Sequence, residues 1–64
     1  MKKIYHLRIL DGTSNGYTKT VTSDRMDSYS ANYHFYDIVD GYKVSVAYYP
    51  SGRTIIESIE DVGE

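Results

Sequence analysis

Tyrosine is the residue type in this chain whose number and spacing suggest chemistry. The sequence has eight tyrosines against one phenylalanine and no tryptophan, and six of the eight fall between residues 29 and 49. A tyrosine ring offers a large contact area and its hydroxyl group forms hydrogen bonds, so recognition surfaces favour it. We predict that one face of the strands in this region binds a partner through His34, Tyr36, Lys43 and Tyr49. The opposite, core-facing side is predicted to hold Tyr5, Tyr33, Tyr42 and Tyr48.

Catalytic and metal-binding chemistry has little support in the sequence. His6 and His34 are the only imidazoles, and Asp37, three residues after His34, points to the opposite face of a strand. No serine has the glycine-rich context of a nucleophile elbow, and the loop 11–16 is followed by no phosphate-binding lysine. We therefore expect no enzymatic activity, no metal site and no cofactor.

The charge of the chain is nearly balanced, with seven basic and nine acidic residues and a formal net charge of -2. This balance favours neither a nucleic-acid binder nor a mimic of nucleic acid. Polar residues interrupt the opening segment before it reaches the length of a signal peptide or a membrane span. We expect one domain over residues 1–64, located in the cytoplasm and not in a membrane. The acidic residues near the end are interpreted as a solvated terminus: Glu57, Glu60, Asp61 and Glu64.

The dipeptide Asp40-Gly41 gives the clearest structural signal, because it lies between two alternating, aromatic-rich runs. Asp-Gly suits a two-residue type I′ turn, which fixes the register of the strands that it joins. We predict strands at residues 33–39 and 42–49 with four cross-strand pairs: Val39 with Tyr42, Asp37 with Val44, Phe35 with Val46 and Tyr33 with Tyr48.

The other elements follow from alternation and turn chemistry. Residues 2–10 and 17–22 alternate as strands, and residues 23–31 have the caps and spacing of a short helix. Pro50, Ser51 and Gly52 suit a turn that folds a last strand back onto residues 42–49, with Val46 opposite Ile56. We predict a β-rich α+β fold, a mostly antiparallel sheet of about five strands, either open or a small barrel, with one helix between the second and third strands. Its core is predicted to contain Phe35, Val44, Val46 and Ile56.

Self-association is the expected source of additional stability, because 64 residues build a small core and the chain has no cysteine for a disulfide. The second face of the predicted sheet is too apolar for one short helix to cover. We therefore predict a homodimer, with a small monomeric domain as the alternative. The predicted dimer interface consists of Ile38, Ala47, Ile55 and Ile59.

A binding role follows from this combination of tyrosines, balanced charge and missing catalytic motifs. We expect a non-enzymatic protein-binding module, of the kind found among small bacterial or phage accessory proteins and inhibitors, that occupies the surface of another protein. The alternative is a module that binds single-stranded nucleic acid or a nucleotide through stacked aromatic rings. An oligomeric enzyme with a site between subunits is a third class.

Overall fold

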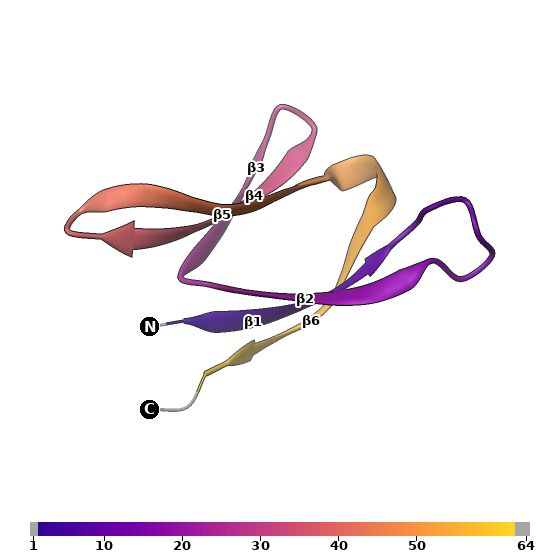
Figure 1. Cartoon of the computed structure of the whole chain (residues 1–64), viewed down its shortest axis with the longest axis horizontal. Helices are drawn as coiled ribbons and strands as arrows, with labels where there is room; N and C mark the ends of the chain where they lie inside the picture. Colours follow the sequence, from indigo (N-terminus) through magenta and orange to yellow (C-terminus); the bar gives the residue numbers. More distant parts are fainter. Residues whose placement is uncertain (1, 63–64) are drawn as a thin grey trace.

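Two three-stranded antiparallel sheets make up the computed structural model, which describes residues 2–62 (Figure 1). The first sheet has the order β2-β1-β6, with β1 at Lys3–Ile9, β2 at Tyr17–Ser23 and β6 at Thr54–Asp61. The second has the order β3-β4-β5, with β3 at Arg25–Tyr29, β4 at Asn32–Val39 and β5 at Tyr42–Pro50. A short 3-10 turn, η1 at Ser51–Arg53, connects β5 to β6. The predicted β-rich antiparallel fold is confirmed, but the single five-stranded sheet is wrong, and the sheets do not close into a barrel.

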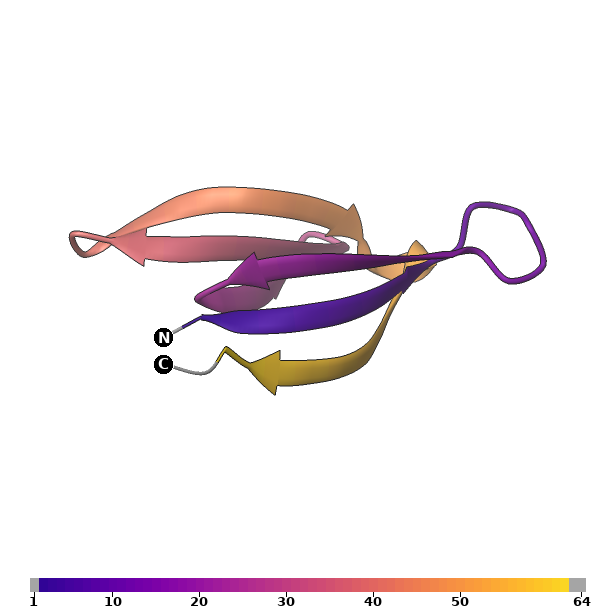
Figure 2. The same cartoon turned by 60° about the horizontal axis from the view of Figure 1, so that its bottom comes forward.

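The chain crosses between the sheets at two points. Asp24 alone separates β2 from β3, so one bent strand contributes to both sheets. The return passes through Pro50 and η1, where the backbone N–H of Ser51 donates to the carbonyl of Ala31 at 2.9 Å. Figure 2 shows the two layers that result.

The predicted helix at residues 23–31 is wrong, because these residues form the end of β2, the bend at Asp24, β3 and the turn that follows it. Met26 pairs with Phe35 and packs against the core, while its neighbours alternate outward. Ser30 and Ala31 make the turn with positive φ angles of 51° and 63°. Polar and aromatic residues here are weak helix formers, and pairing with β4 satisfies their backbone groups.

The predicted turn between β4 and β5 is confirmed, with positive φ at Asp40 (53°) and Gly41 (82°). The pairs Val39 with Tyr42 and Asp37 with Val44 are also confirmed. Between Tyr36 and Phe35 the register then shifts by one residue. The extra residue is Val46, and such a bulge reverses the faces of the β5 residues beyond it. The predicted pairs of Phe35 with Val46 and Tyr33 with Tyr48 are therefore wrong, and the structure pairs Phe35 with Ala47 and Tyr33 with Tyr49.

The last strand pairs with β1 and not, as predicted, with β5. Ile56 lies opposite Leu7, and the predicted pair with Val46 is wrong. Backbone hydrogen bonds flank the β1–β6 pair at both ends, from Leu10 to Arg53 at 2.7 Å and from Val62 to Lys2 at 3.1 Å. The η1 turn carries the chain across to the other layer, whereas a hairpin would have kept it in the same sheet.

The core lies between the two sheets and centres on Phe35, which is fully buried. Its ring meets that of Tyr5 edge-on, with centroids 5.1 Å apart. Ile56 is partly buried against this cluster, as predicted, but Val44 and Val46 are 47% and 44% exposed, and their assignment to the core is wrong. The other buried members of the cluster are Leu7, Ile9 and Val21.

An ionic cluster holds the first crossing point in place. The Nζ of Lys2 lies 2.9 Å from the Asp37 carboxylate, which also accepts a hydrogen bond from the backbone N–H of Asp24 at 3.0 Å. The carboxylate of Asp24 accepts from the backbone N–H of Ile38 at 2.8 Å. Hydrogen bonding to Lys2 lowers the pKa of Asp37, and the same bond raises the pKa of Lys2. The start of β1, the bend and the last residues of β4 are thereby tied together.

Candidate binding surface

The outward face of the second sheet gathers aromatic residues from all three of its strands. Cross-strand pairing places Asp27 beside His34 and His34 beside Tyr48, and the alternation of each strand adds the neighbouring outward residues. We call this surface the aromatic patch and define it by Asp27, Tyr29, His34, Tyr36, Lys43 and Tyr48.

A stacked pair of rings forms the centre of the aromatic patch. The rings of His34 and Tyr48 are nearly parallel, with centroids 4.3 Å apart and an angle of 4° between their planes. The Nε2 atom of His34 lies 2.9 Å from the Oγ atom of Ser45, and this hydrogen bond orients the imidazole. Tyr36 continues the row, with its ring centroid 5.2 Å from that of His34. The row is therefore organised before any partner arrives.

A single ion pair borders this row. The Nζ atom of Lys43 lies 4.8 Å from the centroid of the Tyr36 ring and 3.5 Å from a carboxylate oxygen of Asp27. Lys43 covers Tyr36, which is only 4% exposed, and a cation over an aromatic face is stabilising. Because Asp27 offsets the lysine, the aromatic patch as a whole has little net charge.

Two tyrosine rings remain available for contact. Tyr29 is 69% exposed and Tyr48 is 56% exposed. They border an open hollow of about 370 Å³ between β3 and β5. The hollow is also lined by Asp27, Ser28, His34 and Lys43.

Three of the four predicted partner-binding residues meet on this surface: His34, Tyr36 and Lys43. The fourth, Tyr49, lies on the other side of the sheet, where its ring packs at 6.1 Å from that of Phe35. Because of the bulge in β5, Tyr48 occupies the position on this surface that was predicted for Tyr49. Tyr29 was missed because its segment was predicted as helix, although its alternation with Met26 and Ser28 fits a strand equally well.

The four residues predicted for a dimer interface are dispersed. Ile38 lies on the outward face of the second sheet, and Ala47 packs against the core. Ile55 and Ile59 belong to β6, opposite Arg8 and Tyr5 of the first sheet. They come from both sheets and from different faces, and the homodimer and its interface stay predictions.

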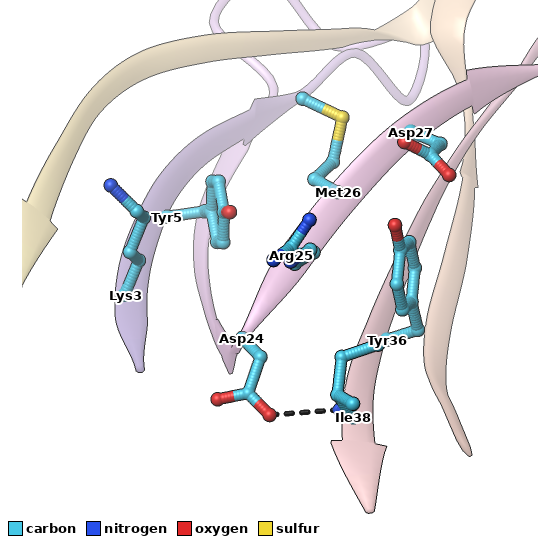
Figure 3. Close-up of a pocket in the computed structure, with 8 residues that line it drawn as sticks. All are labelled: Lys3, Tyr5, Asp24, Arg25, Met26, Asp27, Tyr36 and Ile38. Carbon is cyan, nitrogen blue, oxygen red and sulfur yellow. Dashed lines mark hydrogen bonds between the residues drawn. The ribbon is translucent and has the colours of Figure 1, made fainter. Parts of the chain in front are cut away.

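A larger hollow of about 680 Å³ lies where the chain bends between β2 and β3 (Figure 3). Asp24 is held there by its hydrogen bond to Ile38, which the figure shows as a dashed line. Burial raises the pKa of the Tyr5 hydroxyl, which moves this group further from ionisation at neutral pH. The charged groups come in both signs, and the lining has no histidine or cysteine that would pair as a nucleophile and base: Lys3, Tyr5, Asp24, Arg25, Met26, Asp27, Tyr36 and Ile38.

The acidic side chains of β6 contact basic and histidine side chains of β1. Glu57 accepts a hydrogen bond from Arg8 at 2.9 Å, and Asp61 lies 3.3 Å from Lys3. The Nε2 atom of His6 lies 2.6 Å from the Glu60 carboxylate. Glu64, also predicted for this end, lies outside the described residues.

Neither a metal centre nor a membrane helix is found in the part of the chain that the structure describes. Within residues 2–62, no three histidine, cysteine or acidic side chains gather in a way that would hold a metal ion. The same residues contain no helix of the length and hydropathy needed to cross a membrane.

Comparisons with known proteins identify no relative. No protein-family model matches the chain, and searches of curated proteins and of solved structures found no match either. The surfaces themselves therefore carry the functional argument.

Proposed function

We propose that this protein is a non-enzymatic binding module that recognises another protein through the aromatic patch. The observation that carries the proposal is the stacked His34–Tyr48 pair beside the exposed ring of Tyr29. Rigid aromatic side chains lose little conformational entropy on binding, and protein interfaces are enriched in them. Tyr36 and Lys43 pack against each other at one side of this surface.

A protein partner suits the charge of the aromatic patch. Phosphate backbones are bound by clusters of lysine and arginine, and each such contact contributes to affinity. Here the lysine of the patch is paired with Asp27 at 3.5 Å. A surface of exposed aromatic rings with a balanced ion pair at its border resembles the centre and rim of a protein–protein interface. The role we propose is that of a small cytoplasmic accessory protein or inhibitor that works by covering a partner's surface.

Single-stranded nucleic acid is the second candidate partner, and the row of aromatic rings is the one feature of the patch that favours it. Bases stack on exposed aromatic side chains, and Tyr29 and Tyr48 are open enough to accept them. Such binding would weaken steeply as salt is raised, whereas contacts centred on neutral aromatic rings would not.

The experiment compares two variants in affinity capture from a bacterial lysate, with quantification of each captured protein. The test variant is Tyr29→Ala with Tyr48→Ala. The matched control is Tyr17→Ala, which removes a 47% exposed tyrosine from the first sheet. We expect the wild type and the control to capture the same protein and the test variant to lose it, since a hot-spot residue contributes about 2 kcal/mol or more, roughly thirtyfold in Kd. Equal capture by all three proteins, or salt-sensitive gel retardation of single-stranded nucleic acid, would refute the proposal.

A further inference from the structure

The β5 strand is an edge of the second sheet and is poorly protected against pairing with another chain. Its nine residues contain one charged side chain, Lys43, and its only proline is the last residue, Pro50. Edge strands usually resist pairing through charges, prolines or short length. Two of the other edges have such charges: β6 contains Glu57, Glu60 and Asp61, and β3 contains Arg25 and Asp27. The remaining edge, β2, has one charged residue, as β5 does, but its exposed side chains are mostly threonine and not large hydrophobic ones.

Apolar side chains are exposed along the same strand. The Lys2–Asp37 ion pair marks where β1 begins beneath the second sheet, and the β4–β5 turn extends past this point (Figure 1). Beyond it, Val39 and Tyr42 are 49% and 75% exposed. Val44, opposite Asp37, is 47% exposed on the same face of the sheet. These side chains point to the core side of the sheet, but the first sheet leaves them uncovered.

Among the described residues, large hydrophobic side chains are more often exposed than buried within one copy. The accessible surface of 4459 Å² is close to the roughly 4,200 Å² expected for a folded monomer of 7.3 kDa, so the fold itself is compact. Among the described residues, six hydrophobic side chains are buried and eleven large ones are exposed. A protein interface of standard size would bury about 800 Å² on each partner, roughly a fifth of this surface. A second copy would thus supply burial that the single chain lacks.

We propose that two copies of this chain pair through their β5 edges, antiparallel, about a twofold axis at Val44. The two residues that flank a two-residue turn form a hydrogen-bonded pair, here Val39 with Tyr42. Because hydrogen-bonded and non-bonded pairs alternate, the backbone groups of Lys43 and Ser45 point away from β4, to the open edge. These are the donors and acceptors that a second strand would satisfy.

Charge selects the register of this pairing. An axis at Lys43 would place two lysines opposite each other, which is destabilising. An axis at Ser45 would bring the bulge next to Val46 into the centre of the pair. An axis at Val44 sets Lys43 opposite Ser45 of the partner subunit and joins them by backbone hydrogen bonds. It also sets Val44 against Val44 of the partner subunit in a close, non-bonded pair.

The result is one continuous six-stranded sheet that displays both aromatic patches on the same face. Self-association by this route does not depend on the proposed recognition of another protein. It can therefore hold or fail by itself.

The test uses cysteines as reporters, because the chain has none of its own. In a non-bonded antiparallel pair the Cα atoms lie about 4.5 Å apart, within the range that a disulfide spans. Val44→Cys should form a covalent dimer under mild oxidation. Val39→Cys is the matched control, since Val39 is equally exposed but lies on β4, one strand away from the axis. We expect cross-linking of the first variant to be at least tenfold faster.

Sedimentation across a dilution series provides the second measurement. The wild type and Val39→Lys should sediment at twice 7.3 kDa at high concentration and dissociate on dilution, whereas Val44→Lys should stay monomeric. Circular dichroism of each variant checks that the fold is retained, and the cysteine result holds even if a lysine variant unfolds. A wild type that stays monomeric at high micromolar concentration, or equal cross-linking of the two cysteine variants, would overturn the proposal.

Discussion

Thr54 has a buried hydroxyl group whose Oγ1 atom has no hydrogen-bond partner among the described residues. The residue is 4% exposed, at the start of β6 opposite Ile9. A buried polar atom without a partner costs free energy that an apolar group of the same shape does not.

Replacing this threonine by valine removes the unpaired hydroxyl while keeping the volume. We expect Thr54→Val to raise the free energy of unfolding by about 1 kcal/mol, measured by urea denaturation. Thr54→Ser is the control, because it keeps the hydroxyl and loses a methyl group, at a cost of about 0.8 kcal/mol. A loss of stability in the valine variant would mean that the hydroxyl has a partner.

The contribution of Asp37 to the free energy of unfolding depends on pH. Its pKa is lowered in the folded chain by the hydrogen bond to Lys2, so the native state binds this proton less tightly than the unfolded chain. The contribution is present above the unfolded pKa, about 3.9, and disappears as the pH falls through the lower folded pKa. We expect Asp37→Asn to melt below the wild type at neutral pH, and the difference in Tm to shrink as the pH falls below about 4.

The control for this pH series is Asp40→Asn, which keeps a residue that tolerates positive φ in the turn. Its Tm should follow the wild type through the acid range. A constant difference between Asp37→Asn and the wild type would show that the carboxylate does not titrate with folding.

At the scale of elements, the two turns of the second sheet are chemically unequal. Both use positive φ at their two central residues, but one is Asp40-Gly41 and the other is Ser30-Ala31. A left-handed conformation costs about 1–2 kcal/mol for an ordinary residue and little for glycine or asparagine. The β3–β4 turn is therefore held by pairing and by the hydrogen bond from Ser51 to Ala31.

Giving the β3–β4 turn the residues that its geometry favours should stabilise the protein. We expect Ser30→Asn with Ala31→Gly to raise the free energy of unfolding by about 1–2 kcal/mol. Gly41→Ala tests the same physics in reverse and should lower it by about 1 kcal/mol. Thermal melts of the variants check both signs, and an unchanged Tm in each would mean that the turns are not of this type.

The same elements show how far the sequence could predict the fold. Asp40-Gly41 fixed the nearest two pairs, because turn chemistry acts over a few residues. No glycine or proline marks the bulge between Ser45 and Ala47. This single extra residue was enough to exchange the faces of the sheet on which Tyr48 and Tyr49 lie. Met26 and Tyr29 fit a helix or a strand equally well, and only pairing with β4 decides between them.

The pairing of β6 with β1 was out of reach of local reasoning. The two strands are far apart in the sequence. The residues Pro50, Ser51 and Gly52 suit a hairpin turn as well as the 3-10 turn η1, so their composition does not show which strand β6 pairs with. The candidate site was predicted in part. His34 and Tyr36 lie on β4, whose alternation the bulge in β5 does not change, and Lys43 lies on the turn side of the bulge, so the predicted faces of these three residues hold.

At the scale of the whole molecule, one aromatic side chain joins the two layers. Phe35 contacts Tyr5 of the first sheet and Tyr49 of the second. We expect Phe35→Ala to lower the free energy of unfolding by about 3–5 kcal/mol, most of the stability of so small a domain. Val46→Ala is the control and should cost far less, because Val46 is 44% exposed. Similar losses in the two variants would place the core elsewhere.

The pairing of the first strand with the last also sets an order of events in time. The strands of the second sheet are contiguous in the sequence, so their hairpins close short loops, whereas β1 must wait for β6 to complete the first sheet. During synthesis, β6 also leaves the ribosome after the other five described strands. We expect pulse-labelled hydrogen exchange to protect the amides of β4 and β5 before those of β6. Until β6 has been synthesised, the edge of β1 that it covers is exposed to neighbouring chains.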